Sequence, residues 1–358
     1  MVAILIHGPL RFAARILGTH LTTPSPSRSV QQTGPSLLNA YIALACVCFF
    51  WGTTYLGIRI ALESFTPAML MFLRYSISGS VLLLGAWMKG AQFPTRSELW
   101  KTAMYGVITI GFGTGSLAWA EQWIPSGLAA LMVCTQPFWL TGLEALTHNG
   151  ERLHAPVVRG MLVGLLGVAF LVLPSLGGFS GNNALKTADL MIGFLVLQFG
   201  AAMWCAGSIG QRKLTTRAHP FVSGGVQQMA TGVAFVIPAF WPGQHQHWTA
   251  PGMGAIVYLA IFGGIVGYSS YIFALDKLPV ALVSIYTYVN PLVAVLLGYV
   301  FYREAFGWRE SVAMIVIFVG VAMVKWGSPK FGSPKSGSPQ KSASKMVTPM
   351  VTPDELGE

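Results

Sequence analysis

Apolar segments of roughly 20 residues follow one another from residue 38 to residue 326, with short polar breaks between them. A segment of this length can cross the hydrocarbon core of a bilayer as a helix. The pattern predicts an all-α integral membrane protein with ten transmembrane helices. The expected spans lie at about 38–60, 66–88, 101–120, 125–146, 157–174, 188–211, 220–240, 252–274, 279–301 and 309–326.

The pattern also repeats along the chain. A spacing of 153 positions relates six pairs of identical residues: Trp51 and Trp204, Arg59 and Arg212, Pro67 and Pro220, Gly79 and Gly232, Glu151 and Glu304, Gly167 and Gly320. A spacing of 154 relates Pro125 to Pro279 and Pro137 to Pro291. We therefore expect two repeats of five spans each, at 38–175 and 188–326. Internal repeats of this kind are common in transporters, where they surround one central site.

Lys and Arg in the breaks predict the orientation, because cytoplasmic loops carry an excess of both. With the N-terminus inside, the inner breaks hold Lys89, Arg96, Lys101, Arg152, Arg159, Arg212, Lys213, Arg217 and Lys277. The outer breaks then hold Arg59, Lys186, Arg303 and Arg309. This bias favours two cytoplasmic termini in the inner membrane. Because each repeat has an odd number of spans, the second must be inverted relative to the first.

The two ends of the chain differ from the repeats. Residues 1–37 match neither repeat, and we interpret them as a cytoplasmic N-terminal tail or as non-native sequence added by an upstream start codon. Residues 327–358 begin with a Gly-Ser-Pro repeat that has almost no apolar content. Such a composition cannot bury a core, so a disordered cytoplasmic tail is expected.

Composition excludes several classes of protein. The chain is 53% hydrophobic and only 9% charged, far below the roughly 25% of soluble domains. Its net charge of +10 is scattered over breaks and tails, so no nucleic-acid partner is expected. Its four cysteines lie in apolar segments, which predicts neither a disulfide nor a metal site. Enzyme motifs and phosphate-binding loops are absent, so we expect neither an enzyme nor a cofactor.

Charged side chains are rare inside the expected spans. Arg74 lies well inside its span, where a charge is costly and should face the bundle interior. It is a counter-ion for an anionic solute, or the structural partner of Glu63 or Glu121, or a side chain that snorkels to the outer interface. Glu151 and Glu304 each precede the last span of a repeat, where a carboxylate can cap the start of a helix or form a gate ion pair.

Pro137 and Pro291 lie in the middle of matching spans. A proline there frees a backbone carbonyl and kinks the helix, which lipid tolerates only where the freed group faces protein or water. Gln136 and Asn290 place an amide beside each proline. We interpret the two amides as contacts to solute and the two prolines as structural or gating elements.

Aromatic residues gather near the same spans. Some are expected at the membrane interfaces, but others are predicted to line a cavity for solute. Those assigned to solute binding, with Arg74, Gln136 and Asn290, are Trp51, Trp119, Trp139, Trp204, Tyr268 and Tyr286.

These features resemble the EamA family of the drug/metabolite transporter superfamily, over about residues 38–326. The resemblance rests on Trp51-Gly52, on Pro67 with Arg74, on the stretch from Ala120 to Ala130, and on Gln136-Pro137, Gly150-Glu151-Arg152 and Gly167-Val168. The second half answers with Pro279-Val280-Ala281, Asn290-Pro291, Arg303-Glu304 and Gly320-Val321. Residues 148–149 depart from the family pattern, as do the two tails.

The resemblance implies two inverted five-helix EamA-like repeats that move small metabolites or drug-like solutes, commonly outward. A coupled proton or an exchanged solute would drive such a carrier. The expected function is therefore a secondary-active exporter that works by alternating access, with a small solute and the lipid bilayer as its partners. A carrier or flippase of lipid-linked molecules and a non-transporting membrane scaffold remain alternatives. The sequence leaves the substrate and the oligomeric state open.

Overall fold

The computed structural model describes residues 35–147, 154–176, 187–244, 246–278, 280–283, 285–304 and 306–327. Glu151, Pro279 and nearly all of the two predicted tails lie outside these ranges. All contacts considered below lie within one compact unit, Asn39–Glu358.

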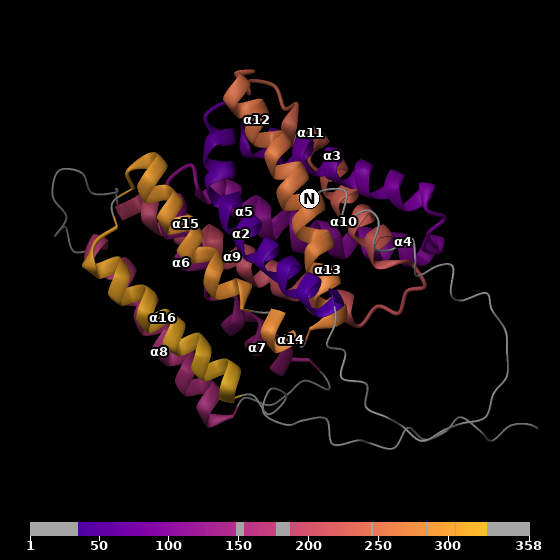
Figure 1. The fold of residues 1–358 in the computed structure, drawn as a ribbon. Helices are drawn as coiled ribbons and strands as arrows, with labels where there is room; N and C mark the ends of the chain where they lie inside the picture. Colours follow the sequence, from indigo (N-terminus) through magenta and orange to yellow (C-terminus); the bar gives the residue numbers. More distant parts are fainter. Residues whose placement is uncertain are drawn as a thin grey trace, which may run out of the picture. The chain divides into compact units, whose positions relative to one another are not determined.

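Every regular element in the described ranges is a helix (Figure 1). The elements of the first half are α2 (Pro35–Leu62), α3 (Pro67–Met88), α4 (Arg96–Gly106), the π-helix η3 (Val107–Phe112), α5 (Gly113–Ala120), α6 (Ser126–Val133), α7 (Gln136–Ala145) and α8 (Ala155–Leu176). Those of the second half are α9 (Thr187–Arg212), α10 (Pro220–Ala234), α11 (Val236–Ala239), α12 (Ala250–Tyr258), the π-helix η4 (Leu259–Gly267), α13 (Tyr268–Lys277), α14 (Val280–Val283), α15 (Tyr286–Tyr302) and α16 (Trp308–Gly327).

Four helical stretches are long and apolar enough to cross a membrane without interruption: Leu37–Leu62, Pro67–Met88, Ala188–Arg212 and Ala250–Leu275. Two shorter apolar helices, Ala155–Phe170 and Tyr286–Tyr302, are also present. An all-α membrane fold is therefore confirmed. The number of ten spans stays a prediction, because several expected spans consist of two or three helical segments.

Prolines explain two of these interruptions. A proline lacks the N–H that would bond to the carbonyl four residues earlier, and its ring crowds that carbonyl. Pro137 lies four residues after Val133, where α6 ends, and Pro238 lies four residues after Ala234, where α10 ends. Pro137 is thus in the first turn of α7 and not in the middle of a continuous helix, which corrects the expected mid-span kink. Pro291, by contrast, lies inside α15, as expected.

The outer surface of the bundle suits lipid. On α8, Leu162, Leu165 and Leu166 are more than half exposed, and on α16 the same holds for Ile315. Large exposed tryptophans lie near helix ends, where aromatic rings favour the headgroup region; they are Trp87, Trp100, Trp241, Trp248, Trp308 and Trp326. Both features fit helices that are surrounded by lipid.

Helices at equivalent places in the two repeats pack against each other. In Figure 1, α8 and α16 lie side by side, and they are in extensive contact. A Cβ atom on Gly160 would lie 2.7 Å from the nitrogen of Val324, and one on Gly167 would lie 2.9 Å from the nitrogen of Ile317. Between them, a Cβ on Gly320 would overlap the backbone of Gly164. As the residue number rises along α8, the number of the contacted residue on α16 falls, so the two helices run antiparallel.

The pair α3 and α10 shows the same relation. A Cβ on Gly79 would lie 2.5 Å from the nitrogen of Met229, and one on Gly232 would lie 2.8 Å from the nitrogen of Ser76. Met229 is 153 positions after Ser76, so the two contacts are reciprocal, as expected at a two-fold axis. Antiparallel mates with reciprocal contacts are the arrangement that an inverted repeat requires.

Glu304 links the two halves. Its Oε1 accepts hydrogen bonds from the backbone nitrogen and the hydroxyl of Ser126, and its Oε2 accepts one from the nitrogen of Gly127, each at 2.9 Å. These groups form the N-terminus of α6, whose free N–H groups and dipole favour a carboxylate. A capping role was predicted, but for the following helix. At the start of α16 the cap is instead Glu310, which accepts from Gly307 at 2.8 Å.

We expect Gly320→Ala to destabilise the α8–α16 contact, because the added methyl would overlap backbone rather than a movable side chain. The free energy of unfolding should fall by roughly 1–3 kcal/mol. Gly85→Ala in α3 is the control, since a Cβ there meets nothing within 4 Å, and it should gain about 0.5 kcal/mol from the better helix propensity of alanine. Unfolding in mixed micelles measures both, and equal effects would contradict the described crossing.

Glu304→Gln should lower the free energy of unfolding by about 1–2 kcal/mol, because α6 loses its charged cap. Glu310→Gln removes a cap from one exposed helix start and should cost only about 0.5 kcal/mol. Thermal unfolding of the two purified variants compares them. If Glu304→Gln lowers the free energy of unfolding no more than Glu310→Gln does, the Glu304 carboxylate does not join the halves as described.

Candidate functional site

Arg74 lies inside the bundle on α3, and only 5% of it is exposed. Its guanidinium lies over the ring of Tyr75, with Cζ 4.8 Å from the ring centre. Nε and Nη1 have no hydrogen-bond acceptor among the described residues. Neither Glu63 nor Glu121 forms an ion pair with it in this part of the chain. The structural pairing considered for Arg74 is therefore not present, and the site holds a buried cation with unused donors.

Trp51 and Arg74 meet at one glycine of η4. The indole Nε1 of Trp51 donates to the carbonyl oxygen of Gly263 at 3.2 Å. A Cβ on Gly263 would lie 2.8 Å from Nη2 of Arg74, so the guanidinium lies directly against this glycine. Residues from α2, α3 and η4 thus form one wall that carries a cation and an indole.

Aromatic rings continue this wall. The ring centre of Trp51 lies 5.2 Å from that of Tyr271 and 5.0 Å from that of Tyr286. The two tyrosine rings lie 5.8 Å apart with their planes nearly perpendicular. Edge-to-face contacts of this kind fix the ring orientations. Tyr271 was not among the predicted solute contacts.

Asn290 supports the backbone around Pro291. With its amide nitrogen turned towards them, the side chain donates to the carbonyls of Tyr286 and Cys48, each 3.0 Å away. Asn290 is 8% exposed. Its donors therefore hold α15 against α2, and this position next to the aromatic wall is compatible with a role in shaping it.

The predicted residues on α7 and α9 are Gln136, Trp139 and Trp204, and they form a second group. Gln198 accepts from the hydroxyl of Thr135 and from the indole of Trp139, both at 2.9 Å. Gln136 is half-buried, and its backbone carbonyl accepts a hydrogen bond from the thiol of Cys205 at 3.3 Å. Most of the predicted solute contacts thus fall into two groups.

The two repeated tryptophans occupy equivalent positions. A Cβ on Gly113 would lie 2.8 Å from the indole of Trp204, and one on Gly267 would lie 2.5 Å from the indole of Trp51. Gly113 and Gly267 are 154 positions apart, so each tryptophan packs on the same glycine of the opposite half. These contacts give the site the two-fold relation of the repeats.

Tyr268 and Trp119 lie apart from both groups. The ring of Tyr268 fills the space beside Gly224 of α10, where a Cβ would overlap it. Trp119 on α5 packs on Phe235, with ring centres 6.0 Å apart. Their described contacts are those of packing residues, and solute binding by them stays a prediction.

Sequence reasoning missed a buried polar layer beside Arg74. The hydroxyl of Ser78 donates to the side chain of Gln228, whose Nε2 donates to the carbonyl of Gly264 at 3.1 Å. Gln227, the repeat mate of Arg74, is buried, and its Nε2 has no partner among the described residues. The pair Gln227-Gln228 in an apolar segment was the available signal.

The repeated arginines lie at two helix ends. Arg59 near the end of α2 donates to the carbonyl of Glu121 and lies 5.9 Å from the ring centre of Tyr302. The hydroxyl of Tyr302 donates to Glu63. Together with the cap that Glu304 provides, these contacts join α2, α5, α6 and α15. We name this region the Arg59 end; Glu304 forms no ion pair with Arg303 there among the described residues.

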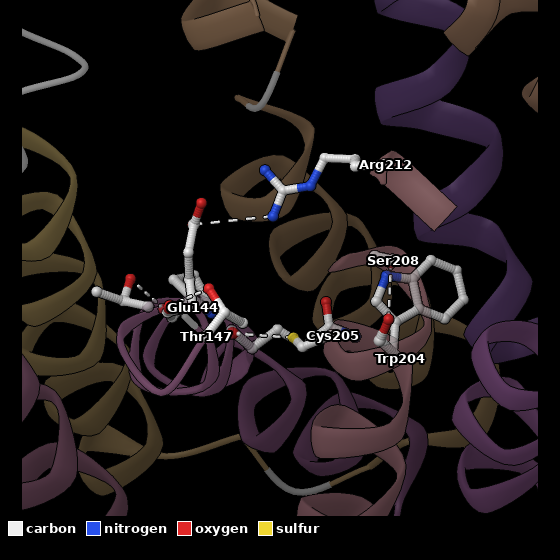
Figure 2. A network of polar contacts seen from close by, with 9 residues as sticks. Glu144, Thr147, Trp204, Cys205, Ser208 and Arg212 are labelled. Atoms are coloured by element: carbon white, nitrogen blue, oxygen red, sulfur yellow. Dashed lines mark hydrogen bonds and ion pairs between the residues drawn. The ribbon is translucent and has the colours of Figure 1, made fainter. Parts of the chain in front are cut away.

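Arg212 is the repeat mate of Arg59 and lies near Glu144 (Figure 2), and we name the region around these two residues the Arg212 end. Nη2 of Arg212 lies 3.8 Å from Oε2 of Glu144 on α7. The side chains of Arg212 and Glu144 are 56% and 27% exposed. An exposed pair at this distance contributes little stability. This ion pair is therefore a weaker link between the halves than the cap that Glu304 provides at the Arg59 end.

Comparisons with known proteins agree with this architecture. The EamA-like transporter family matches residues 38–173 and again 191–326. The chain is 32% identical over 296 residues to the uncharacterized inner membrane transporter YedA of Escherichia coli K12, covering 81% of this chain and 92% of YedA. It is 24% identical over 270 residues to a probable terminal-alkyne amino-acid exporter of Streptantibioticus cattleyicolor, covering 75% and 87%.

The fold is also similar to that of a protein with a solved crystal structure. The TM-score is 0.58 at 21% sequence identity, and the match covers 83% of this chain and 99% of the other. This likeness supports the arrangement of the helices. The twofold match to one domain and the reciprocal packing of the repeats lead to one conclusion: the chain belongs to the EamA-like transporter family, within the drug/metabolite transporter superfamily.

Proposed function

We propose that this protein is a secondary-active exporter of small organic solutes that carry a carboxylate or a similar anion on an apolar or aromatic body. Membership of the EamA-like family makes it a membrane transporter. The observation that carries the rest is Arg74, a buried guanidinium with unused donors in a wall of aromatic rings.

The chemistry of Arg74 favours an anionic partner. Placing a charge at the centre of a membrane helix costs about 3 kcal/mol, so an unpaired one is retained where it serves binding. A guanidinium offers two parallel donors that match a carboxylate. Nε and Nη1 of Arg74 are free to play this part. One relative is named as a probable terminal-alkyne amino-acid exporter, and an amino acid carries a carboxylate.

The aromatic wall favours solutes with a ring or an alkyl chain. Trp51 is bonded to the glycine of η4 that lies beside Arg74, and the rings of Tyr271 and Tyr286 pack on Trp51. Ring contacts contribute about 0.5–1.5 kcal/mol each beyond burial. A cation next to such a wall selects an amphipathic anion over a purely polar one.

Alternating access is supported by contacts between the halves at both ends. The Arg59 end is joined by the hydrogen bonds of Glu304 and Tyr302, and the Arg212 end by the exposed pair of Arg212 with Glu144 and by the bond from the nitrogen of His219 to the carbonyl of Gln92. In an inverted repeat such contacts break and form in turn as the halves rock around a midplane site. YedA is an inner membrane protein, and we place this chain in the inner membrane as well.

A second candidate, a carrier of lipid-linked molecules, is favoured by a shallow groove on the outside of α15 and α16. Its lining is almost entirely apolar and comprises Tyr288, Ile315, Phe318, Val319, Ala322, Met323 and Trp326. An acyl chain fits such a surface. The groove offers no charged side chain for a headgroup, so we favour the soluble anion.

Arg74→Gln should abolish export while the protein still inserts into the membrane. Losing a charge-assisted contact of about 1.5–3 kcal/mol corresponds to a loss of at least tenfold in transport. Metabolites in the medium of cells that overproduce wild type, the variant and an empty vector measure this effect. We expect a few anionic solutes to be enriched with wild type alone.

Arg309→Gln is the matched control, because Arg309 is exposed at the start of α16 and lies over Trp308. It should export like wild type. Full export by Arg74→Gln at equal protein level would disprove the role of Arg74. Enrichment of lipid-linked molecules in place of soluble anions would support the second candidate.

A further inference from the structure

Glu121 follows α5 directly, and its side chain is fully buried, with 0% exposed. Neither of its carboxyl oxygens has a hydrogen-bond partner among the described residues. An ionised carboxylate without donors is very unfavourable away from water, so such a group takes up a proton. Burial raises the pKa of Glu121 well above its ordinary value, nearby Arg59 opposes this, and nearby Glu304 adds to it.

The charged and titratable neighbours of Glu121 come from two elements. From α2, Arg59 and Tyr55 interact with it electrostatically. Arg59, however, donates to the backbone carbonyl of Glu121 and not to its carboxylate. From the segment after α15, Glu304 contributes a like charge, with both oxygens already bound at the start of α6.

Arg59 also lies over the ring of Tyr302, whose hydroxyl donates a hydrogen bond to Glu63. Arg59, Glu304 and Tyr302 are thus occupied by other contacts. Glu121 is left as a buried carboxyl group without donors, for which the closed Arg59 end favours the neutral form.

The position of Glu121 connects this proton to the conformation of the bundle. Glu121 lies between α5 and α6, and α6 is held at its N-terminus by Glu304 of the other half. If the halves part at this end, water reaches Glu121 and Arg59 loses its neighbours on α15. The carboxyl can then release its proton to water and remain as a carboxylate beside Arg59.

We propose that Glu121 is the proton-binding site of the transporter and takes up one proton each time the Arg59 end closes. The proposal rests on the proposed alternating access. The carboxylate gains a proton from water on the side that this end faces, and returns it there or to the solute pathway when the end opens. No electrons move, and the ligand is the proton alone.

The dependence on pH has a definite sign. A group whose pKa is raised in one state stabilises that state at low pH and loses this contribution as the pH rises through the raised value. The closed Arg59 end should therefore be favoured by acid and weakened by base. Above that pKa, the protonated fraction of a single group falls about tenfold per pH unit. Glu121→Gln, which is always neutral, should remove this dependence.

Infrared spectroscopy of the purified full-length protein tests the protonation directly and needs no solute. Wild type should show the C=O stretching band of a buried protonated carboxylic acid, and the band should fade as the pH is raised. The band should be absent in Glu121→Gln and retained in Glu144→Gln, whose carboxylate is paired with Arg212. An unchanged band in Glu121→Gln would overturn the proposal. Titration of wild type alone remains decisive if that variant fails to fold, since a wild-type band that is missing or independent of pH also overturns it.

Transport then tests the coupling. With the solute found in the medium, export by wild type in cells should vary with external pH by about tenfold per unit above the pKa, and export by Glu121→Gln should vary less than twofold. Identical pH profiles of the two would overturn the coupling while leaving export intact. An infrared band that behaves as expected without export by any variant would instead contradict the proposed function and keep the proton site.

Discussion

The close approach of repeat-mate helices at glycines is the constraint on which the rest of the structure depends. In a bilayer the hydrophobic effect gives little drive for helices to associate, so packing at short distance must supply it. Gly160, Gly164 and Gly320 let α8 and α16 meet backbone to backbone, and Gly79 and Gly232 do the same for α3 and α10. These contacts also fix the antiparallel direction of each pair, and with it the inverted relation of the repeats.

A firm centre has consequences for the site and for the ends. Because each mate pair is locked by backbone contacts, the remaining freedom lies in the groups that bridge the halves through side chains. At the centre these are Trp51 and Arg74, which contact η4, and Trp204, which packs on Gly113. At the ends they are Arg59 with its neighbours and Arg212 with Glu144. Side-chain contacts can break and form again at small cost, which is what alternating access requires.

Much of the fold could be predicted from the sequence, because length and hydrophobicity determine membrane helices and identical residues at a fixed spacing reveal a duplication. The all-α membrane fold and the family are confirmed on this basis. Pro137 and Pro291 show the limit. Both were expected to kink a continuous helix, but the sequence does not say which helix will break and which will bend, since neighbouring contacts such as those of Asn290 decide it.

The candidate site was predicted less well, for a geometric reason. Successive residues of a helix point in directions about 100° apart, so which side chains meet depends on helix rotations that no local pattern specifies. Contacts between segments far apart in the chain produce the cap that Glu304 forms on α6, the hydrogen bonds that Gln198 accepts, and the burial of Glu121. Roles in solute binding for Trp51, Arg74 and Gln136 stay predictions.

The central claim is that the two halves part at the Arg59 end in each transport cycle. A Cβ on Gly193 of α9 would lie 2.8 Å from Cγ2 of Ile124, which follows Glu121 at the Arg59 end, a separation that suits a disulfide between cysteines at these two positions. The decisive measurement is export by a protein with Ile124→Cys and Gly193→Cys, in a background whose four native cysteines are replaced. Oxidation should stop export and reduction should restore it. Full export with the disulfide formed would show that this end never opens and would contradict the account.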